Sequence, residues 1–314
     1  MVAIAHESSS PSPLEELFRP LAFADFIRDY FDQKPLHLTG RPDSVFTGSL
    51  TSDWMEQMLR DGYFTYPSIR LISRGEDIET ETYVRDIEYG TSTMFGVIDP
   101  QAVLKAFGEG VTIIINAVNR HNAIIRQLCR SLAMAFRIDV NANAYLTPPR
   151  SAGTEAHYDN HDVLIIQIAG SKHWTIHEPV ILLPLRGQKI DLPDDLGDAM
   201  LSPVLHPGDL LYLPRGYIHA AATADETSIH VTVAIAPITW YEVLREALEV
   251  CRDDEEFRRA LSPAGVSSNG ERRVYESLLD QVRAAAPFET VIDRFRAYLP
   301  EKSVFPHGNN DETA

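Results

Sequence analysis

Short apolar segments separated by glycine, proline and aspartate fill residues 138–237, and this pattern constrains the fold more than any other feature of the chain. The segments are of strand length and no helical periodicity interrupts them. Regularly spaced short strands without intervening helices are typical of a jelly roll or a barrel. We therefore expect a mainly β fold here, with strands at residues 140–146, 163–168, 173–177, 210–213 and 229–235.

Helical patterns flank this β region on both sides. Residues 13–33 predict a short helix, a break at Pro20 and a second helix, and apolar positions at steps of three and four predict an amphipathic helix over residues 122–137. After Pro237 the pattern is helical almost to the end of the chain. Between the first helices, strands are expected at residues 34–38, 68–72 and 111–115.

The domain organisation follows from these patterns. We expect a disordered leader at residues 1–12, a β-rich domain with N-terminal helices at residues 13–237, a helical region at residues 238–305 and a disordered tail at residues 306–314. The helices after Pro237 have apolar faces with little mass to cover them. Those faces are therefore expected to pack on the barrel or on a second copy of the chain, and a homodimer is the expected assembly.

Composition excludes several classes of function. The chain has 314 residues and a net charge of −17, without a basic stripe, which argues against nucleic-acid binding. No apolar stretch is long enough to span a bilayer. Only Cys129 and Cys251 are present, which predicts a reducing, cytoplasmic setting. The acidic surface either attracts a basic peptide or protein, or only maintains solubility.

Three residues from two distant segments predict a metal site. His157 and Asp159 lie two positions apart, and along a strand such residues project from the same face. His219 follows the strand and turn of residues 207–217, which would present it at the rim of a barrel. Two imidazoles and one carboxylate on one side of a metal form a facial triad, which is typical of non-haem Fe(II) oxygenases. His157, Asp159 and His219 are therefore the expected metal ligands and catalytic centre.

The chain has eleven histidines, so the choice of ligands needs an argument. His161 continues the alternation from His157 and Asp159 and competes as a ligand, although a facial triad needs only three protein donors. We expect His161 to be a pocket residue instead. Four others are expected to have structural roles. His173 and His177 alternate along a strand without a carboxylate partner, while His206 precedes the Pro-Gly turn and His230 lies within a strand, where both are expected to make structural hydrogen bonds.

Lys172 is a candidate anchor for an anionic co-substrate. It follows the turn of residues 169–171, at the start of a predicted strand. Burying a charged lysine inside a small barrel costs free energy unless an anion pairs with it. Lysines at turns are also commonly solvated, and spacing alone does not choose between the two interpretations.

Taken together, these motifs resemble those of a known family. The chain resembles the JmjC oxygenases of the ribosomal-oxygenase type, within the cupin superfamily, from about residue 14 to residue 237. The resemblance rests on combined motifs that are far more specific together than alone: Asn143-Ala-Tyr145-Leu-Thr-Pro-Pro, Gly153, His157-Tyr-Asp159, Gln167, Gly170, Lys172, Trp174, Pro207-Gly-Asp through His219, and Ser228-Ile-His230-Val-Thr.

The resemblance implies a double-stranded β-helix that is followed by a helical dimerisation region. It also implies Fe(II) held by His157, Asp159 and His219, and 2-oxoglutarate as co-substrate with its distal carboxylate against Lys172. By the same comparison, three further residues are implied to contact the co-substrate or its surroundings: Asn143, Tyr145 and Ser228. The implied reaction is hydroxylation of a C–H bond.

Several alternatives remain open at this level. The substrate is either a residue of a protein or peptide, as the family suggests, or an amino-acid-like small molecule. The small molecule is kept because family members that act on ribosomal proteins add a winged helix, whereas 77 residues (314 minus 237) follow the β region here. Demethylation of an N-methyl group proceeds through the same hydroxylation. A metal cupin without oxygenase activity, such as an isomerase or a binding module, is the main rival, and an inert dimeric interaction protein is the third.

Overall fold

The computed structural model describes residues 12–62, 64–261 and 269–297 of the chain. It consists of two compact units, one formed by residues 1–136 and 140–236 and the other by residues 137–139 and 237–314. The tail predicted at residues 306–314, and the predicted leader except for Ser12, lie outside the described residues. Within the described part, no helix combines the length and the apolar character that crossing a membrane requires.

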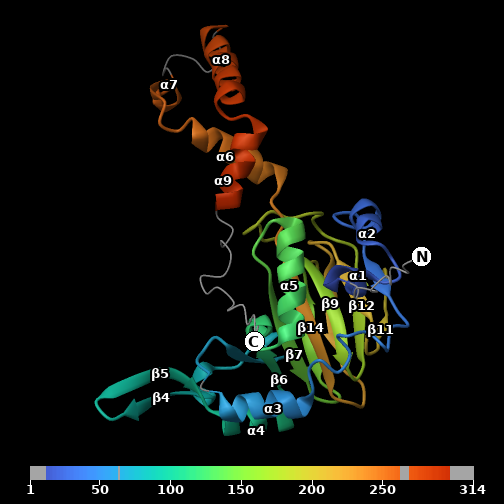
Figure 1. Ribbon diagram of the computed structural model, residues 1–314. Helices are drawn as coiled ribbons and strands as arrows, with labels where there is room; N and C mark the ends of the chain where they lie inside the picture. The colour runs from blue at the N-terminus through green and yellow to red at the C-terminus, as the bar shows by residue number, and fades with distance from the viewer. Residues whose placement is uncertain (1–11, 63, 262–268, 298–314) are drawn as a thin grey trace, which may run out of the picture. The chain divides into compact units, whose positions relative to one another are not determined.

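Antiparallel strands form the body of the first unit (Figure 1). The larger sheet has eight strands, in the order β1 (Leu36–Leu38), β12 (Leu210–Leu213), β9 (Asp162–Ala169), β14 (Ser228–Ile235), β7 (Asn141–Thr147), β6 (Thr112–Ile115), β2 (Ile69–Ser73) and β3 (Glu76–Asp77). The smaller sheet has four, in the order β11 (Val204–Leu205), β10 (Lys172–His177), β13 (Ile218–Ala222) and β8 (Ala152–His157). This pair of sheets confirms the predicted jelly roll.

Side chains from both sheets share one hydrophobic core. Strand β9 is buried along almost its whole length, so both of its faces are covered. Its residues Val163 and Ile165 pack with Trp174 of β10 and with Leu211 and Leu213 of β12 in a single cluster. Because side chains alternate along a strand, this register directs Val163 and Ile165 into the space between the sheets. The same space holds the candidate site.

Among the described residues of the first unit, five α-helices accompany the sheets: α1 (Pro13–Phe18), α2 (Phe23–Asp29), α3 (Ser52–Asp61), α4 (Pro100–Gly108) and α5 (Ala123–Phe136). Helix α5 contacts β7 and α1, and its apolar stripe is buried at Ile125, Leu128, Cys129 and Leu132 (Figure 1). The break at Pro20 and the predicted helices on either side of it are confirmed.

Some small elements were not predicted. Residues 76–98 contain the short strand β3, a 3-10 turn at Thr80–Thr82, and a hairpin of β4 (Val84–Tyr89) and β5 (Ser92–Ile98). A second 3-10 turn, Val118–Arg120, precedes α5. Residues 188–207, which are rich in proline and aspartate, contain an isolated bridge at Leu201 and the two-residue strand β11 (Val204–Leu205).

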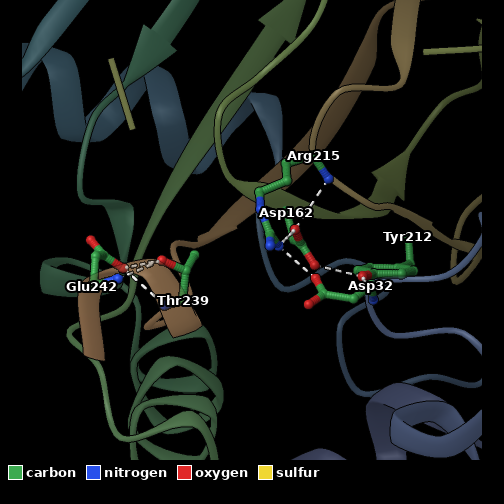
Figure 2. Close-up of polar contacts among 6 residues, drawn as sticks. All are labelled: Asp32, Asp162, Tyr212, Arg215, Thr239 and Glu242. Atoms are coloured by element: carbon green, nitrogen blue, oxygen red, sulfur yellow. Dashed lines mark hydrogen bonds and ion pairs between the residues drawn. The ribbon is translucent and has the colours of Figure 1, made fainter. Parts of the chain in front are cut away.

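The second unit is helical, as predicted after Pro237. It contains α6 (Trp240–Val250), α7 (Glu255–Arg258), α8 (Asn269–Ala285) and α9 (Phe288–Ala297). A capping box starts α6: the Glu242 amide donates to Thr239 Oγ1 and the Glu242 carboxylate accepts from the Thr239 amide (Figure 2). Val243, Ala247 and Val291 form the centre of a small hydrophobic cluster between the helices.

Candidate metal centre

Two histidines lie side by side on neighbouring strands of the smaller sheet. His157 is the last residue of β8, and His219 is the second residue of β13. The two are direct partners in the antiparallel register, and their ring centroids lie 4.4 Å apart. Residues separated by 62 positions in the sequence (219 minus 157) are therefore adjacent because of sheet pairing alone.

Asp159 joins them from a loop rather than from a strand. The sequence predicted a strand that continues through Asp159 and His161, and this is wrong, since β8 ends at His157 and residues 158–161 form the bend that leads into β9. Asp159 Oδ2 lies 3.7 Å from His219 Nε2. Ligand atoms of His157, Asp159 and His219 all lie within 4.8 Å of one another, and no other such cluster occurs among the described residues.

The backbone orients both imidazoles. His157 Nδ1 lies 2.8 Å from the carbonyl oxygen of Glu155, and His219 Nδ1 lies 3.0 Å from that of Tyr217. A carbonyl oxygen only accepts, so each Nδ1 carries the proton and each Nε2 keeps its lone pair. Metal-binding histidines commonly use this arrangement, in which one ring nitrogen donates to a fixed acceptor and the other binds the ion.

Burial keeps the imidazole of His219 neutral. Burial lowers the pKa of His219 well below its usual value, and the neighbouring His157 lowers it further, although Asp159 opposes the shift. A neutral imidazole is the form that binds a metal. Two such nitrogens and one carboxylate oxygen fit a ferrous ion with open positions for other ligands.

The other histidines lie outside this cluster. His161 is not among the clustered donors of the described residues. His173 is exposed, and its Nε2 lies 2.8 Å from Ser202 Oγ, while the backbone amide of His206 donates to Asp209. His230, which was also predicted to be structural, is buried within β14.

A cavity of about 50 Å³ opens between the sheets beside the three residues. This volume is several times the roughly 10–15 Å³ that one water molecule needs. The three candidate ligands form part of its wall, and Val163, Ile165 and Trp174 give it an apolar side. Lys172 also lines it.

Lys172 is a buried ammonium without an acidic partner. Its side chain is 2% exposed, and Nζ donates to Thr147 Oγ1 at 3.0 Å. No carboxylate pairs with it within the part of the chain that the structure describes. Burial alone lowers its pKa to about 7. Burying a charged lysine costs free energy unless an anion lies beside it. The sequence did not decide whether Lys172 is buried or solvated, and its burial favours an anion-binding role.

Gly153 makes room for this ammonium. It lies on β8, opposite the end of the Lys172 side chain. A Cβ atom at this position would lie 2.9 Å from Lys172 Nζ and 3.1 Å from the carbonyl oxygen of Ala221. The absence of a side chain at Gly153 therefore leaves the space that the Lys172 ammonium occupies.

Three aromatic rings complete the wall next to Lys172. His230 is 2% exposed, stacks on Tyr145 at 4.7 Å and 8°, and meets the edge of Trp174 at 5.5 Å. Its Nδ1 has no hydrogen-bond partner in the described structure. Burial, and then the charge of Lys172, lower the pKa of His230 well below its usual value. The ring thus faces the cavity as a neutral hydrogen-bonding group, which its place in an apolar strand did not reveal.

Three residues were implied to contact a co-substrate, and they occupy different places. Tyr145 lines the cavity, and burial raises its pKa to about 12. Asn143 Oδ1 accepts from the amide of Ala117, and Ser228 Oγ accepts from Gln167 Nε2. Asn143 and Ser228 are not among the described residues that line the cavity. Thr154 was not predicted, although it lines the cavity and its buried Oγ1 has no partner in the described structure.

Comparison with known proteins places this site in a family. The JmjC domain family matches residues 116–243, a range that contains all three clustered residues. The protein named bifunctional lysine-specific demethylase and histidyl-hydroxylase NO66 of Dictyostelium discoideum is 32% identical over 79% of this chain and 48% of its own length. Ribosomal oxygenase 1 of Danio rerio is 26% identical over 78% of this chain and 45% of its own length.

Solved structures show the same fold. The ribosomal oxygenase YcfD of Escherichia coli, in complex with cobalt and 2-oxoglutarate, aligns with a TM-score of 0.58 and 16% identity over 93% of this chain and 75% of its own. The chain spans about half the length of the curated relatives it matches, or less, with 48%, 33% and 24% for three of them. By its matched family model and its fold, the chain contains a JmjC domain that spans residues 116–243.

Proposed function

We propose that this protein is an Fe(II)- and 2-oxoglutarate-dependent oxygenase that hydroxylates a C–H bond of a protein or peptide residue. One observation carries the proposal: a single cavity holds a cluster of two histidines and an aspartate, together with a buried lysine that has no acidic partner in the described structure. The histidines and the aspartate suit a ferrous ion, and the lysine suits a carboxylate. A dicarboxylate of the right length would satisfy both.

The ion and co-substrate, when bound, supply the oxidation: dioxygen converts a C–H bond to C–OH while 2-oxoglutarate loses carbon dioxide and becomes succinate. The protein's own residues bind and orient. His157, Asp159 and His219 would hold Fe(II) on one side, which leaves the opposite side for the co-substrate and substrate. Lys172 would bind the distal carboxylate. Val163, Ile165 and Trp174 line the same cavity with apolar surface, which would help to exclude water.

A basic segment of a protein is the proposed substrate. The chain carries a net charge of −17, and the segment of residues 191–198 contains four exposed aspartates. The residue before this segment is tied to the loop that carries the candidate ligands: the Tyr158 hydroxyl accepts from the amide of Ile190 at 2.6 Å, and Tyr158 lies between His157 and Asp159 in the sequence. The names of the relatives, histidyl-hydroxylase and ribosomal oxygenase, favour a protein residue as well. We further propose that the protein acts in the cytoplasm. Asn143 and Ser228 are proposed to contribute to the surroundings of the co-substrate.

Incubation of the full chain with Fe(II), 2-oxoglutarate and two matched sets of histidine-containing peptides tests the proposal. One set has lysine- and arginine-rich flanks and the other has acidic flanks. We expect succinate release, and a mass gain of one oxygen on basic peptides. Formaldehyde release from N-methylated lysine peptides would identify demethylation instead. A complete lack of 2-oxoglutarate turnover, with and without peptides or cell extract, would favour the rival cupin without oxygenase activity.

Gly153→Ala is expected to weaken the use of 2-oxoglutarate selectively. The added methyl group displaces the Lys172 ammonium, because it would lie 2.9 Å from Nζ. We expect the KM for 2-oxoglutarate to rise roughly tenfold, equivalent to ~1.4 kcal/mol, while the affinity for the metal stays unchanged. Initial rates of succinate release at varied 2-oxoglutarate concentrations measure this. Gly108→Ala is the matched control, since a Cβ there meets no atom within 4 Å, and an unchanged KM in Gly153→Ala would contradict the placement of Lys172.

We also propose that the exposed face of α6 pairs with a second copy of the chain. Trp240, Leu244 and Leu248 are spaced by four residues and are 72%, 65% and 51% exposed. Leu244→Glu is expected to convert a dimer to a monomer, because a carboxylate is costly to bury in an apolar interface. Light scattering during size-exclusion chromatography measures the mass. Met134→Glu on α5, where the side chain is 81% exposed, is the control, and a monomeric wild-type chain would refute the proposed pairing.

A further inference from the structure

Next to the metal centre lies a buried carboxylate that none of the proposed chemistry uses. Asp162 is the first residue of β9 and is fully buried. Its Oδ2 accepts from the Tyr212 hydroxyl at 2.5 Å. Its Oδ1 accepts from Arg215 twice, from the backbone amide at 3.1 Å and from Nη1 at 3.0 Å (Figure 2). Both oxygens of this carboxylate are therefore engaged.

A fourth residue closes the group. Asp32, which follows α2, accepts from Arg215 Nη1 at 2.5 Å, and its backbone amide donates to the Tyr212 hydroxyl at 3.1 Å. We call Asp32, Asp162, Tyr212 and Arg215 the Asp162 cluster. Figure 2 shows its four side chains converging, from the segment after α2, the start of β9, the strand β12 and the turn after it.

The cluster connects the two segments that carry metal ligands. Asp162 lies three residues after Asp159, and Arg215 lies four residues before His219. The residue after Arg215 adds a direct link, since the Gly216 amide donates to the carbonyl oxygen of Asp159 at 3.0 Å. None of the four cluster residues belongs to the group of metal-binding donors.

Asp159 depends on such a link because it lies outside the sheet. The pairing of β8 with β13 sets the distance between His157 and His219. No strand ladder fixes Asp159, which lies in the bend between β8 and β9. A metal site tolerates deviations of only about 0.2 Å in ligand distance. The bonds from Asp162 to Arg215 and from Gly216 to Asp159 supply the missing constraint.

The composition of the cluster agrees with a positioning role. Burying an aspartate and an arginine together often adds little stability compared with apolar residues of similar size. Arg215 is 6% exposed and Asp162 is 0% exposed at the side chain, so their charges are withdrawn from water. Their hydrogen bonds are directional, and they specify where the turn of residues 214–217 lies relative to the bend of residues 158–161.

We propose that the Asp162 cluster is a positioning device that holds Asp159 at metal-binding distance from His219, so that its loss weakens metal binding in a folded protein. The inference rests on the proposed function, because it concerns the same metal centre. Partners outside the ligand set commonly contribute 10–100-fold to metal affinity. None of the four cluster residues is among the described residues that line the cavity, so they would act through Asp159 and His219.

Co(II) titration of the full chain tests this, with visible absorption of the bound ion as the readout. Asp162→Asn keeps the shape and removes the charge, and Asp32→Asn is a milder second variant, since the Asp32 side chain is 36% exposed. We expect Co(II) to bind Asp162→Asn roughly 10–100-fold more weakly, with an altered absorption band, and Asp32→Asn to show a smaller change in the same direction. Asp77→Asn is the matched control, since it breaks the Arg70–Asp77 pair elsewhere in the larger sheet.

The possible results separate the two proposals. If wild-type protein does not bind Co(II), the proposed metal centre itself is wrong. If the wild type binds and both cluster variants keep its affinity and absorption band, while only their melting temperatures fall, the cluster is merely structural and the inference is overturned. Should Asp162→Asn fail to fold, an unchanged affinity and band in folded Asp32→Asn would overturn it as well.

Discussion

Asp159→Ala is expected to abolish metal binding and turnover while leaving the fold intact. The carboxylate supplies the only negative charge among the three clustered donors, and without it two neutral imidazoles remain to hold a divalent ion. Turnover should fall by at least ~1000-fold, since the reaction depends on the metal. The Asp159 side chain is 29% exposed and lies in a bend, so its removal leaves the hydrophobic core unchanged. Calorimetric titration with Co(II), and succinate release with Fe(II), measure the two effects.

A histidine of the same sheet provides the control for this variant. His173 lies on β10, is exposed and is not among the clustered donors. His173→Ala is expected to keep metal affinity and turnover within about twofold, as is usual for surface changes that stay within ~0.5 kcal/mol. If Asp159→Ala and His173→Ala behave alike, Asp159 is not a metal ligand.

Lys172→Met is expected to have two opposite effects. The KM for 2-oxoglutarate should rise by roughly 100-fold, because a buried carboxylate loses its charge-assisted hydrogen bond, a loss of ~2.7 kcal/mol. The ligand-free protein should become more stable. Burial lowers the pKa of Lys172 to about 7 from the usual 10.5, so at neutral pH folding has to bury or discharge an ammonium. An apolar side chain of similar length avoids this and adds stability on the order of a few kcal/mol.

The gain in stability has a defined pH dependence. Between pH 10.5 and pH 7 the unfolded chain keeps the Lys172 proton while the folded chain releases it. The wild type therefore loses stability as the pH falls through this window. The advantage of Lys172→Met should be small near pH 10.5, grow as the pH falls, and level off below about pH 7.

Urea unfolding of the ligand-free chains at several pH values measures this second effect. Lys105→Met, at a lysine that is 77% exposed, is the control and should show no comparable pH-dependent gain. A Lys172→Met protein that is no more stable than wild type at pH 7, and that uses 2-oxoglutarate equally well, would show that Lys172 faces solvent. The placement of its ammonium in the cavity would then be wrong.

The predictions that succeeded depend on strong local patterns. The run at residues 163–168 is apolar at nearly every position, so it is recognisable as a buried strand. The helix at residues 123–136 follows from apolar steps of three and four. His157 and His219 could be selected because turns delimit their segments and because the combined motifs resemble those of a family. Pattern and resemblance together led to the three residues that the structure brings into one cluster.

What the sequence did not reveal depends on tertiary neighbours. Strand periodicity predicted that Asp159 lies on β8, whereas the bend that holds it is tied to Gly216, which lies 57 positions away (216 minus 159). His230 was predicted to be structural because it lies within a strand, and the structure shows that it lines the cavity and stacks on Tyr145. The burial of Lys172 likewise depends on Gly153, a residue on another strand. No local pattern encodes such contacts.

A crystal structure of the full chain with Co(II) and 2-oxoglutarate is the most direct test of the central claim. We expect one ion at about 2.0–2.2 Å from Nε2 of His157, Nε2 of His219 and a carboxylate oxygen of Asp159. The distal carboxylate should lie within hydrogen-bonding distance of Lys172 Nζ, about 2.7–2.9 Å. The central claim is that one cavity binds both the metal ion and 2-oxoglutarate. It would be contradicted by an ion bound elsewhere, or by a co-substrate that makes no contact with Lys172.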